Sequence, residues 1–325
     1  MTKATVYLLQ RYFEGIPKED DLEIVEENLP PLKDGEFLAE ALYLSVDPYM
    51  RLKAAGLKLG TPFIGHQVAK IIDSKSSEYP EGTIIVGAFG WRTHTISNGT
   101  SNVSATPGVW KVPDIGDLPL SLAIGMLGRV GNTAYFGFLE LCQPKQGETV
   151  VVSSAGGAVG SHVGQIAKIK GCKVIGITGS DEKGKWLVNE LGFDHFINYK
   201  NPNFVNTLTE YTPQGIDCYF DNVGGEISNA VMTRMNKYGR ISVCGFISSY
   251  NATTLPLEPI LQPVMIQKEL KMEGFGVHRW ASRWQEGILQ NLKWIQEGKL
   301  KYKETVTQGF ENMFSPFLQC YKEKT

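Results

Sequence analysis

The stretch "VVVSSAGGAVGSHVGQIAKIKGC", residues 150–172, decides the fold of the larger part of this 325-residue chain. A β-branched run opens it and leads directly into a glycine-rich turn. The segment after the turn places Val163, Ile166 and Ala167 on one helical face. A strand, a glycine turn and a helix in this order predict the first step of a nucleotide-binding parallel sheet.

The spacing within the turn is Ala155-x-Gly157-x-x-Gly160, with alanine in place of the first glycine of the dinucleotide pattern. Gly157 allows the backbone to approach a pyrophosphate, and Gly160 permits close packing of helix on strand. The start of the helix adds amide donors and a positive dipole. A small-residue turn in any α/β protein is the alternative, but the flanking strand and helix favour cofactor binding.

Strand-like and helix-like segments continue to alternate after residue 172. Ser180 is suited to cap the second helix, and the acids Asp181 and Glu182 follow in its first turn. The further elements expected are a strand at 195–199, a helix near 203–211, a strand at 217–220, a helix near 226–236 and a strand at 239–245. This order predicts a parallel, doubly wound sheet with its ligand at the carboxyl ends of the strands.

Residues 1–126 have a different pattern. Short alternating strands such as "EFLAEALYLSV", "QVAKIID" and "GTIIVGAFGW" are broken by proline and glycine, which predicts a mostly β domain. A single core stops growing near roughly 250–300 residues, so two domains are expected. The net charge of −2, without long blocks of like charge, gives no electrostatic case for nucleic acid or an anionic membrane.

The cysteine pattern indicates a reducing compartment. Five cysteines, an odd number, lie far apart in the sequence: Cys142, Cys172, Cys218, Cys244 and Cys320. The start "MTKATVYLLQRYFEG" is too soon interrupted by polar residues for a secretory signal, and no apolar run approaches membrane length. We therefore expect free thiols and a cytoplasmic protein, and chance sequons at Asn98, Asn102 and Asn251.

The choice of cofactor depends on the end of the second strand. An enzyme that prefers NAD usually carries Asp or Glu there for the ribose 2′-hydroxyl. Here Thr178-Gly179-Ser180 stands instead, followed by Lys183 in the first turn of the helix. A lysine at a helix start opposes the dipole, so a 2′-phosphate partner explains it, with a solvated lysine as the alternative. The sequence favours NADPH.

The mostly β first domain, the central nucleotide fold and "GHQVAK" together resemble the medium-chain dehydrogenase/reductase superfamily. Its zinc members keep an early cysteine ligand, a Gly-His-Glu motif and a four-cysteine lobe. No cysteine precedes residue 142, no C-x-x-C occurs, and Gln67 replaces the glutamate. We expect no metal, and a structural or pocket role for His66.

Several motifs resemble the prostaglandin reductase family, which comprises NADPH-dependent alkenal/one oxidoreductases also described as leukotriene 12-hydroxydehydrogenases. They are "LSVDPYMR", "TAYFG", "GSDEK", "NYK", "DCYFDNVGGE", "GRISVCGFISSYN" and "YKETVTQGFENM". The resemblance implies an α/β protein with a GroES-like domain at 1–126 and 304–325 and a Rossmann domain at 127–303. It also implies a homodimer.

The implied activity is zinc-independent hydride transfer to the β-carbon of α,β-unsaturated ketones and aldehydes, including 15-oxoprostaglandins. A quinone reductase on the same fold and a non-catalytic NADPH-binding protein remain the alternatives. The cofactor contacts that the resemblance implies are Gly157, Ala158, Val159, Gly160, Lys183, Tyr199, Asn222, Cys244, Gly245, Phe246, Ile247, Ser248, Ser249, Tyr250, Phe275, Gly276 and Val277.

Reduction of an enone needs a donor that stabilises the developing enolate oxygen. Tyr250 follows a strand at the carboxyl edge of the sheet, so it is the candidate catalytic donor, with packing against the cofactor as the alternative. Tyr49 and Arg51 are candidates for the pocket wall, although an Arg–carboxylate pair also suits Arg51. The aromatic stretch "FGVHRWASRW" either lines an apolar pocket or belongs to the core.

Two departures from the family pattern bear on these expectations. The family continues past "GFENM" into an N-x-G-K segment and a last strand, whereas this sequence ends at "YKEKT". The implied asparagine contact to the cofactor then has no counterpart, and a neighbouring strand is expected to lose its partner. Gln267 stands where the family often has tyrosine, which removes that residue as a proton relay.

Overall fold

The computed structural model describes residues 2–100, 108–254 and 256–322, and the chain divides into two compact units. The first unit comprises Met1–Gly128 and Glu304–Lys322, and the second comprises Arg129–Lys303. Asn102 and the last three residues lie outside the described residues. Each unit is described by itself below.

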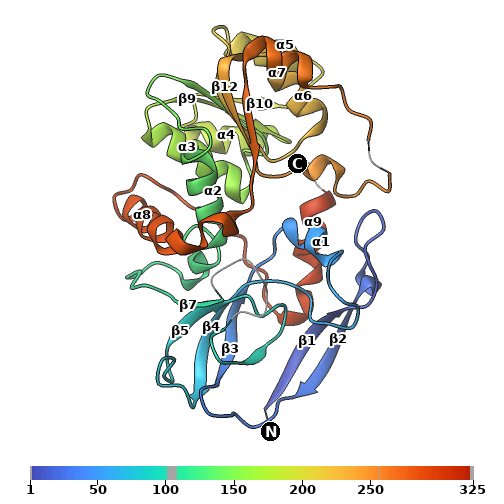
Figure 1. Cartoon of the computed structure of the whole chain (residues 1–325), viewed down its shortest axis with the longest axis vertical. Helices are drawn as coiled ribbons and strands as arrows, with labels where there is room; N and C mark the ends of the chain where they lie inside the picture. Colours follow the sequence, from blue (N-terminus) through green and yellow to red (C-terminus); the bar gives the residue numbers. More distant parts are fainter. Residues whose placement is uncertain (1, 101–107, 255, 323–325) are drawn as a thin grey trace. The chain divides into compact units, whose positions relative to one another are not determined.

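Antiparallel strands build the first unit, as the alternating pattern predicted (Figure 1). β1 (Lys3–Leu9) pairs with β2 (Leu22–Asn28). A five-stranded sheet has the order β6-β3-β4-β5-β7. Its strands are β3 (Phe37–Leu44), β4 (Gln67–Ser74), β5 (Ile84–Gly87), β6 (His94–Ser97) and β7 (Val109–Lys111), and a short helix, α1 (Tyr49–Ala54), follows β3.

The C-terminal helix α9 (Phe314–Lys322) belongs to this first unit, although it starts 203 residues after β7 ends at Lys111 (314 − 111). Phe317 is fully buried, and its ring meets those of Phe63 and Trp91 edge to face at 5.3 and 5.7 Å. Tyr7 in β1 donates a hydrogen bond to the Glu311 carbonyl at 2.7 Å. Aromatic burial therefore holds the two sequence segments together.

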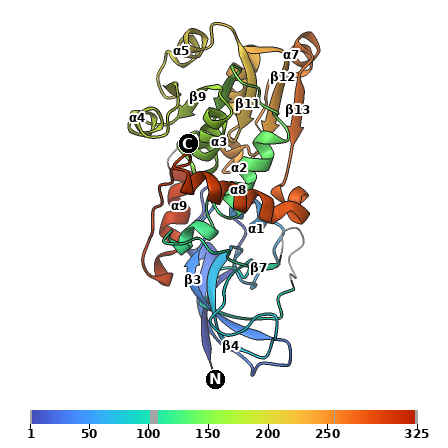
Figure 2. The same cartoon turned by 90° about the vertical axis from the view of Figure 1, so that its left-hand side faces the viewer.

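A six-stranded parallel sheet forms the centre of the second unit, with the order β10-β9-β8-β11-β12-β13. Figure 2 shows β9, β11, β12 and β13 of this sheet. Its strands are β8 (Thr149–Val152), β9 (Lys173–Thr178), β10 (His195–Asn198), β11 (Ile216–Asp221), β12 (Met235–Val243) and β13 (Lys271–Gly274). In chain order within the unit this is 3-2-1-4-5-6, the dinucleotide-binding order that reverses between β8 and β11. The predicted doubly wound fold is confirmed.

Helices cover both faces of this sheet. One face packs against α2 (Arg129–Leu139), α3 (Ala158–Ile169), α4 (Asp181–Asn189) and α8 (Trp284–Gln296). The other face packs against α5 (Phe204–Tyr211), α6 (Gly225–Thr233) and α7 (Gln262–Lys268). Val150 and Val152 point to the first face and Val151 to the second, because side chains alternate along a strand.

Most element boundaries lie within two residues of the sequence-based expectation, and the largest differences fall between α6 and β12. The helix expected at 226–236 ends at Thr233, and the next strand begins at Met235, four residues earlier than expected. Met235 is fully buried in the core on one face of the sheet, so tertiary packing extends the strand toward its N-terminus. The carboxyl end of that strand, which positions the candidate site, is at Val243, two residues before the expected end.

Candidate cofactor and catalytic site

The glycine turn joins β8 to α3. A Cβ on Gly160 would lie 2.3 Å from the Ser154 carbonyl oxygen, so this position has room only for hydrogen. A Cβ on Gly157 would meet nothing nearer than Ser154 Oγ and O, at 3.2 and 3.3 Å. The third glycine thus brings helix onto strand, whereas a Cβ at the second would press on Ser154 by only a few tenths of an ångström.

Lys183 lies beside this turn. It occupies the first turn of α4, and its backbone N–H donates to Oγ of the capping residue Ser180 at 3.3 Å. A Cβ on Gly156 would lie 3.2 Å from Lys183 Cβ and Cδ and 3.0 Å from Thr178 Oγ1. The lysine stem therefore packs over the glycine turn, and the two features that predicted the cofactor come together.

Asn222 follows β11 and is fixed by the end of β8. Its side-chain amide donates to the Ser153 carbonyl at 2.7 Å, and its backbone N–H donates to Ser153 Oγ at 2.9 Å. Ser153 is fully buried and directly precedes the glycine turn. Two of the predicted cofactor segments are therefore linked by one serine.

The loop Cys244–Tyr250 follows β12 and docks on the backbone after β11. The N–H groups of Cys244 and Gly245 donate to the Asp221 carbonyl at 2.8 and 3.1 Å. The N–H of Ile247 donates to the Asn222 carbonyl at 3.3 Å. The carboxyl ends of β8, β11 and β12 thus bring three predicted segments together.

Tyr250 is buried at the end of this loop. Its ring meets Phe246 edge to face at 5.1 Å, and a Cβ on Gly245 would lie 3.2 Å from the phenol oxygen. Burial raises the pKa of Tyr250 to about 12, so the phenol keeps its proton at neutral pH. Burial also raises the pKa of the neighbouring Cys244 thiol to about 12, which argues against a thiolate nucleophile there.

The remaining predicted contacts lie in two segments. Tyr199 follows β10, and its N–H donates to the Thr178 carbonyl at 3.1 Å, near the end of β9. The Phe275 ring packs inward, because a Cβ on Gly137 would lie 2.2 Å from its edge. The Phe275 ring is partly buried, and Val277 is 3% exposed, so the backbone of this segment is the more accessible part of Val277.

The aromatic stretch "FGVHRWASRW" belongs to the core of the second unit. Trp280 stacks on Phe136 with ring centroids 5.4 Å apart, and Trp284 is 2% exposed. The core interpretation, rather than a pocket lining, therefore fits these two tryptophans.

Tyr49 and Arg51 lie on α1 of the first unit. The Tyr49 hydroxyl is 3.2 Å from His66 Nδ1, in hydrogen-bond distance. Arg51 donates to the Gly15 carbonyl at 2.7 Å, and burial lowers the pKa of its guanidinium. The arginine is thus engaged by backbone, while Tyr49 and His66 form a pair that the sequence did not reveal.

Gln67 is fully buried beside that pair. Its amide nitrogen donates to the carbonyls of Gly90 and Arg92 at 2.6 and 2.9 Å. A carboxylate has no proton to donate at neutral pH, so glutamate could not replace it in these bonds. Within residues 2–100, 108–254 and 256–322, no cluster of three or more His, Cys, Asp or Glu side chains is arranged to hold a metal.

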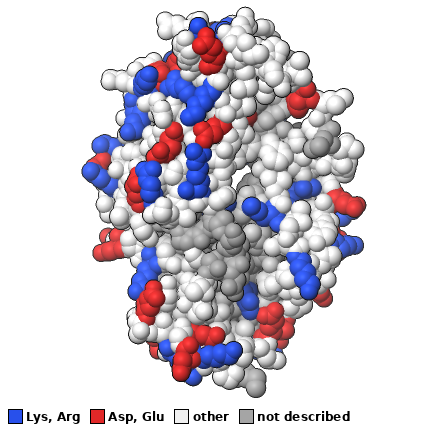
Figure 3. Space-filling model, in the orientation of Figure 1, with Lys and Arg blue, Asp and Glu red and all other residues white. Residues whose placement is uncertain are grey.

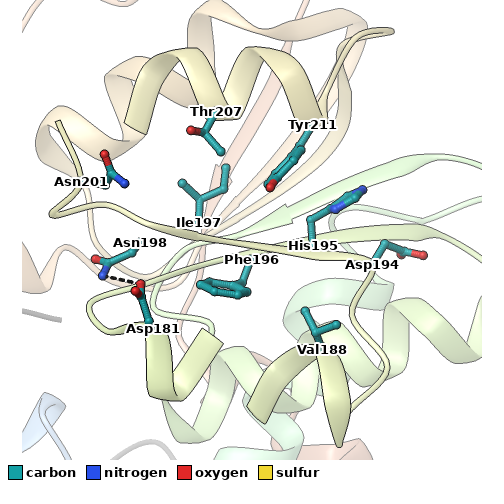
Figure 4. A pocket seen from close by; sticks show the side chains of 10 residues that line it. All are labelled: Asp181, Val188, Asp194, His195, Phe196, Ile197, Asn198, Asn201, Thr207 and Tyr211. Atoms are coloured by element: carbon teal, nitrogen blue, oxygen red, sulfur yellow. Dashed lines mark hydrogen bonds between the residues drawn. The ribbon is translucent and has the colours of Figure 1, made fainter. Parts of the chain in front are cut away.

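A cavity of about 430 Å³ opens along β10 at the edge of the parallel sheet (Figure 4). His195 and Tyr211 stack on each other at one end, and Asn198 donates to Asp181 at 2.9 Å at the other. Its lining contains none of the residues predicted to bind cofactor or substrate.

Charge and hydrophobicity add little to this picture. On the face drawn in Figure 3, Lys and Arg side chains lie interspersed with Asp and Glu, without an extended basic surface. Among the helices of the described chain, none is both long and apolar enough to cross a membrane.

Sequence reasoning missed Ser153 and Asp221 as organisers of this site. The available signal was a carboxylate at the end of a buried strand, followed by "NVGG". An acidic residue at such a position needs donors, and a tight glycine turn supplies backbone N–H groups.

Two family models match the chain: "N-terminal domain of oxidoreductase" over residues 6–104 and "Zinc-binding dehydrogenase" over residues 158–294. With the fold and the glycine turn, they define a medium-chain dehydrogenase/reductase. Prostaglandin reductase 1 of Bos taurus is 52% identical over 99% of this chain and 97% of its own length. The chain belongs to the prostaglandin reductase family.

Two other relatives extend this comparison. The NADP-dependent 2-alkenal reductase of Nicotiana tabacum is 39% identical over 94% of this chain and 90% of its own length. The crystal structure of CurA from Vibrio vulnificus in complex with NADPH matches with a TM-score of 0.90 at 36% identity. That match covers 99% of this chain and 96% of CurA.

Proposed function

We propose that the protein is an NADPH-dependent oxidoreductase that reduces the carbon–carbon double bond of α,β-unsaturated ketones and aldehydes. The observation that carries the proposal is the glycine turn with Lys183 packed over it, in a chain of the prostaglandin reductase family. The unit Arg129–Lys303 is assigned to cofactor binding and the unit Met1–Gly128 with Glu304–Lys322 to the substrate.

The residues present fit an NADPH molecule. The Gly157 backbone at the N-cap of α3 and the first amides of that helix suit a pyrophosphate, and the ammonium of Lys183 suits a 2′-phosphate. Asn222, the loop Cys244–Tyr250 and the backbone of Phe275–Val277 would hold the nicotinamide half. When bound, the reduced nicotinamide supplies the hydride.

Tyr250 is assigned the donor role. Its neutral phenol donates a hydrogen bond to the carbonyl oxygen of the enone, where negative charge develops as the β-carbon accepts hydride. The raised pKa keeps this proton in place across the physiological range. The α-carbon then takes a proton from water, which completes the reduction.

This chemistry defines the substrate as a class, the α,β-unsaturated ketones and aldehydes, and does not single out one molecule. We assign Tyr49 to the pocket wall, with His66 as its hydrogen-bond partner at 3.2 Å. Lipid-derived enones such as 15-oxoprostaglandins, and alkenals, fit the family. The five cysteines, an odd number and far apart in the sequence, suit the cytoplasm, where thiols stay reduced.

The reaction is proposed to need no metal. The amide of Gln67, bound to two backbone carbonyls, occupies the place of the glutamate in the zinc motif. His66 is engaged by Tyr49 instead of a metal-ligand set. The polarising donor is therefore a protein hydroxyl.

Steady-state oxidation of NADPH tests the function. Initial rates are measured side by side with an α,β-unsaturated ketone, its saturated analogue and a quinone. We expect turnover with the unsaturated ketone and none with its saturated analogue. The rate with the unsaturated ketone should also exceed the rate with the quinone. Dominant quinone turnover would favour the quinone reductase, and tight NADPH binding without turnover would favour a non-catalytic protein.

Lys183→Ala tests the cofactor assignment. Charge-assisted contacts contribute roughly 1.5–3 kcal/mol, so the NADPH Kd should rise about 10- to 150-fold while the NADH Kd stays unchanged. Lys185→Ala, two residues along the same helix, is the matched control. Equal rises for both cofactors would contradict the 2′-phosphate role.

We also propose a homodimer. Leu257, Ile260 and Ile266 are 101%, 76% and 77% exposed in the segment that precedes the edge strand β13 in the chain, and a second copy would cover them. Light scattering should give twice the chain mass, and Ile266→Glu should reduce it. Val205→Glu, at an exposed valine of α5, is the control and should leave the mass unchanged. A monomeric unmutated protein would contradict the dimer.

A further inference from the structure

Asp221 is a buried carboxylate that the proposed reaction does not use. It ends β11, is 4% exposed, and lies within the second unit. Its Oδ1 accepts hydrogen bonds from the N–H groups of Val223 and Gly224 at 2.9 and 3.0 Å and from the Tyr219 hydroxyl at 2.9 Å. Oδ2 accepts from the Ser228 hydroxyl. Backbone and hydroxyl donors thus offset the desolvation of this carboxylate.

The carboxylate is connected to the glycine-turn side of the site. The Ser153 hydroxyl lies 3.2 Å from Asp221 Oδ1, and Ser153 Oγ accepts the N–H of Asn222 at 2.9 Å. The Asn222 side-chain amide donates to the Ser153 carbonyl at 2.7 Å. Asp221 therefore orients Ser153, and Ser153 holds both the backbone and the side chain of Asn222.

The same segment supports the loop that carries Tyr250. Beyond the bonds to the Asp221 and Asn222 carbonyls, the Val223 carbonyl accepts the Ser248 N–H at 3.1 Å and the Ser248 hydroxyl at 2.6 Å. The conformation of residues 221–223 thus sets where the loop docks. That conformation is itself fixed by the carboxylate, through the N–H of Val223.

The turn that follows needs such a restraint. Gly224 and Gly225 have φ angles of 70° and 61°, in the left-handed region where glycine has great freedom. An aspartate that accepts backbone N–H groups two and three residues ahead restricts this freedom. Without the carboxylate, the turn would lose its anchor beside the predicted cofactor contacts.

We propose that Asp221 is a positioning residue: its carboxylate sets the conformation of residues 222–225 and, through them, the loop Cys244–Tyr250 for cofactor binding. The inference rests on the proposed NADPH function, and it adds a residue that touches neither cofactor nor substrate. A merely structural role would lower the free energy of unfolding but leave the folded protein with normal affinity.

The experiment compares Asp221→Ala, Asp221→Asn and Asp217→Asn. Asp217 is the matched control, because it lies on the same strand at the opposite end and accepts bonds from Thr149 N–H and Asn236 Nδ2 at 2.9 and 2.8 Å. Asparagine at 221 retains one acceptor oxygen for the two backbone N–H groups, so it serves as the conservative rescue.

Three quantities are measured on each variant well below its unfolding transition: hydrogen exchange of the amides of residues 244–248 without cofactor, the NADPH Kd, and kcat. We expect Asp221→Ala to exchange at least tenfold faster there, with an NADPH Kd raised at least tenfold and a lowered kcat at saturating NADPH. Asp221→Asn should recover most of each loss. Asp217→Asn should leave all three unchanged, whatever its melting temperature.

If Asp221→Ala does not fold, Ser153→Ala removes the hydroxyl that links Asp221 to Asn222 and should raise the NADPH Kd in the same way. Unchanged exchange and Kd in folded Asp221→Ala, or in Ser153→Ala, would overturn the inference. An unmutated protein that fails to bind NADPH would instead overturn the proposed function, while faster loop exchange in Asp221→Ala would still support the positioning of the loop.

Discussion

The two glycines of the nucleotide turn are expected to fail in different ways when each is replaced by alanine. A methyl group on Gly160 would lie 2.3 Å from the Ser154 carbonyl oxygen and 2.8 Å from Ala155 Cα. Both atoms are backbone, so helix and strand must separate. Overpacking costs typically about 1–3 kcal/mol, and the backbone clash places Gly160→Ala near the upper value.

A methyl group on Gly157 meets a different environment. The Ser154 oxygens at 3.2 and 3.3 Å are tight but tolerable, and the φ of −86° suits alanine. Losing glycine as N-cap costs about 1 kcal/mol or less, and the reduced freedom of the unfolded chain offsets about 0.4–1 kcal/mol. Stability should therefore stay nearly constant, while the methyl group occupies the space assigned to the pyrophosphate.

Thermal unfolding and NADPH titration separate the two effects. For a unit the size of Arg129–Lys303, about 3 kcal/mol corresponds to a drop of roughly 6–12 °C in Tm, which we expect for Gly160→Ala. Gly157→Ala should keep its Tm within about 3 °C and raise the NADPH Kd at least tenfold, or about 1.4 kcal/mol.

Gly56→Ala is the control for both measurements, because its Cβ would meet nothing closer than 3.6 Å in the other unit. It should change neither Tm nor Kd. A stable Gly160→Ala, or a Gly157→Ala that binds NADPH normally, would refute the division of roles between the two glycines.

Three further predictions follow from the site and its surroundings. Tyr250→Phe should lower kcat roughly ten- to thousandfold with little change in NADPH Kd, and a raised Kd with unchanged kcat would assign Tyr250 to packing. Because the Tyr250 pKa is raised to about 12, the kcat of the unmutated protein should show no loss from phenol ionisation up to about pH 10. Burial lowers the pKa of His162 to about 4, so as the pH falls below about 6.5 the imidazole is protonated in the unfolded chain before it is protonated in the folded protein. The free energy of unfolding, measured in urea titrations, should therefore fall by on the order of 3 kcal/mol between pH 6.5 and 4. His162→Gln should make the free energy of unfolding less dependent on pH in this range. Turnover should survive exhaustive dialysis against a chelator, since the Gln67 amide binds two carbonyls; stoichiometric zinc whose removal abolishes turnover would contradict this.

Local sequence signals were sufficient for the parallel sheet. The β-branched run before the glycine turn, Ser180 as N-cap and the glycines after the helices each act over a few residues, and the structure places strand, turn and cap there. The start of β12 was wrong by four residues because its first residue, Met235, is held by burial in the core. Burial is a tertiary effect and leaves no local mark.

The candidate site was predictable only in part for the same reason. Lys183 and Gly157 were found because each belongs to a motif with known spacing. The link from Asp221 through Ser153 joins residues 68 positions apart, and the Tyr49–His66 pair joins helix α1 to the residue just before β4. Such contacts depend on which strands become neighbours in the folded chain, and the strand order cannot be predicted from the local pattern of a single sequence.

The position of deuterium in the product tests the central claim most directly. The protein is supplied with NADPH deuterated at the transferable position of the nicotinamide and with an α,β-unsaturated ketone, and the product is examined by NMR. The account predicts a saturated ketone with one deuterium on the β-carbon. Deuterium on the carbonyl carbon, in an allylic alcohol, would contradict it.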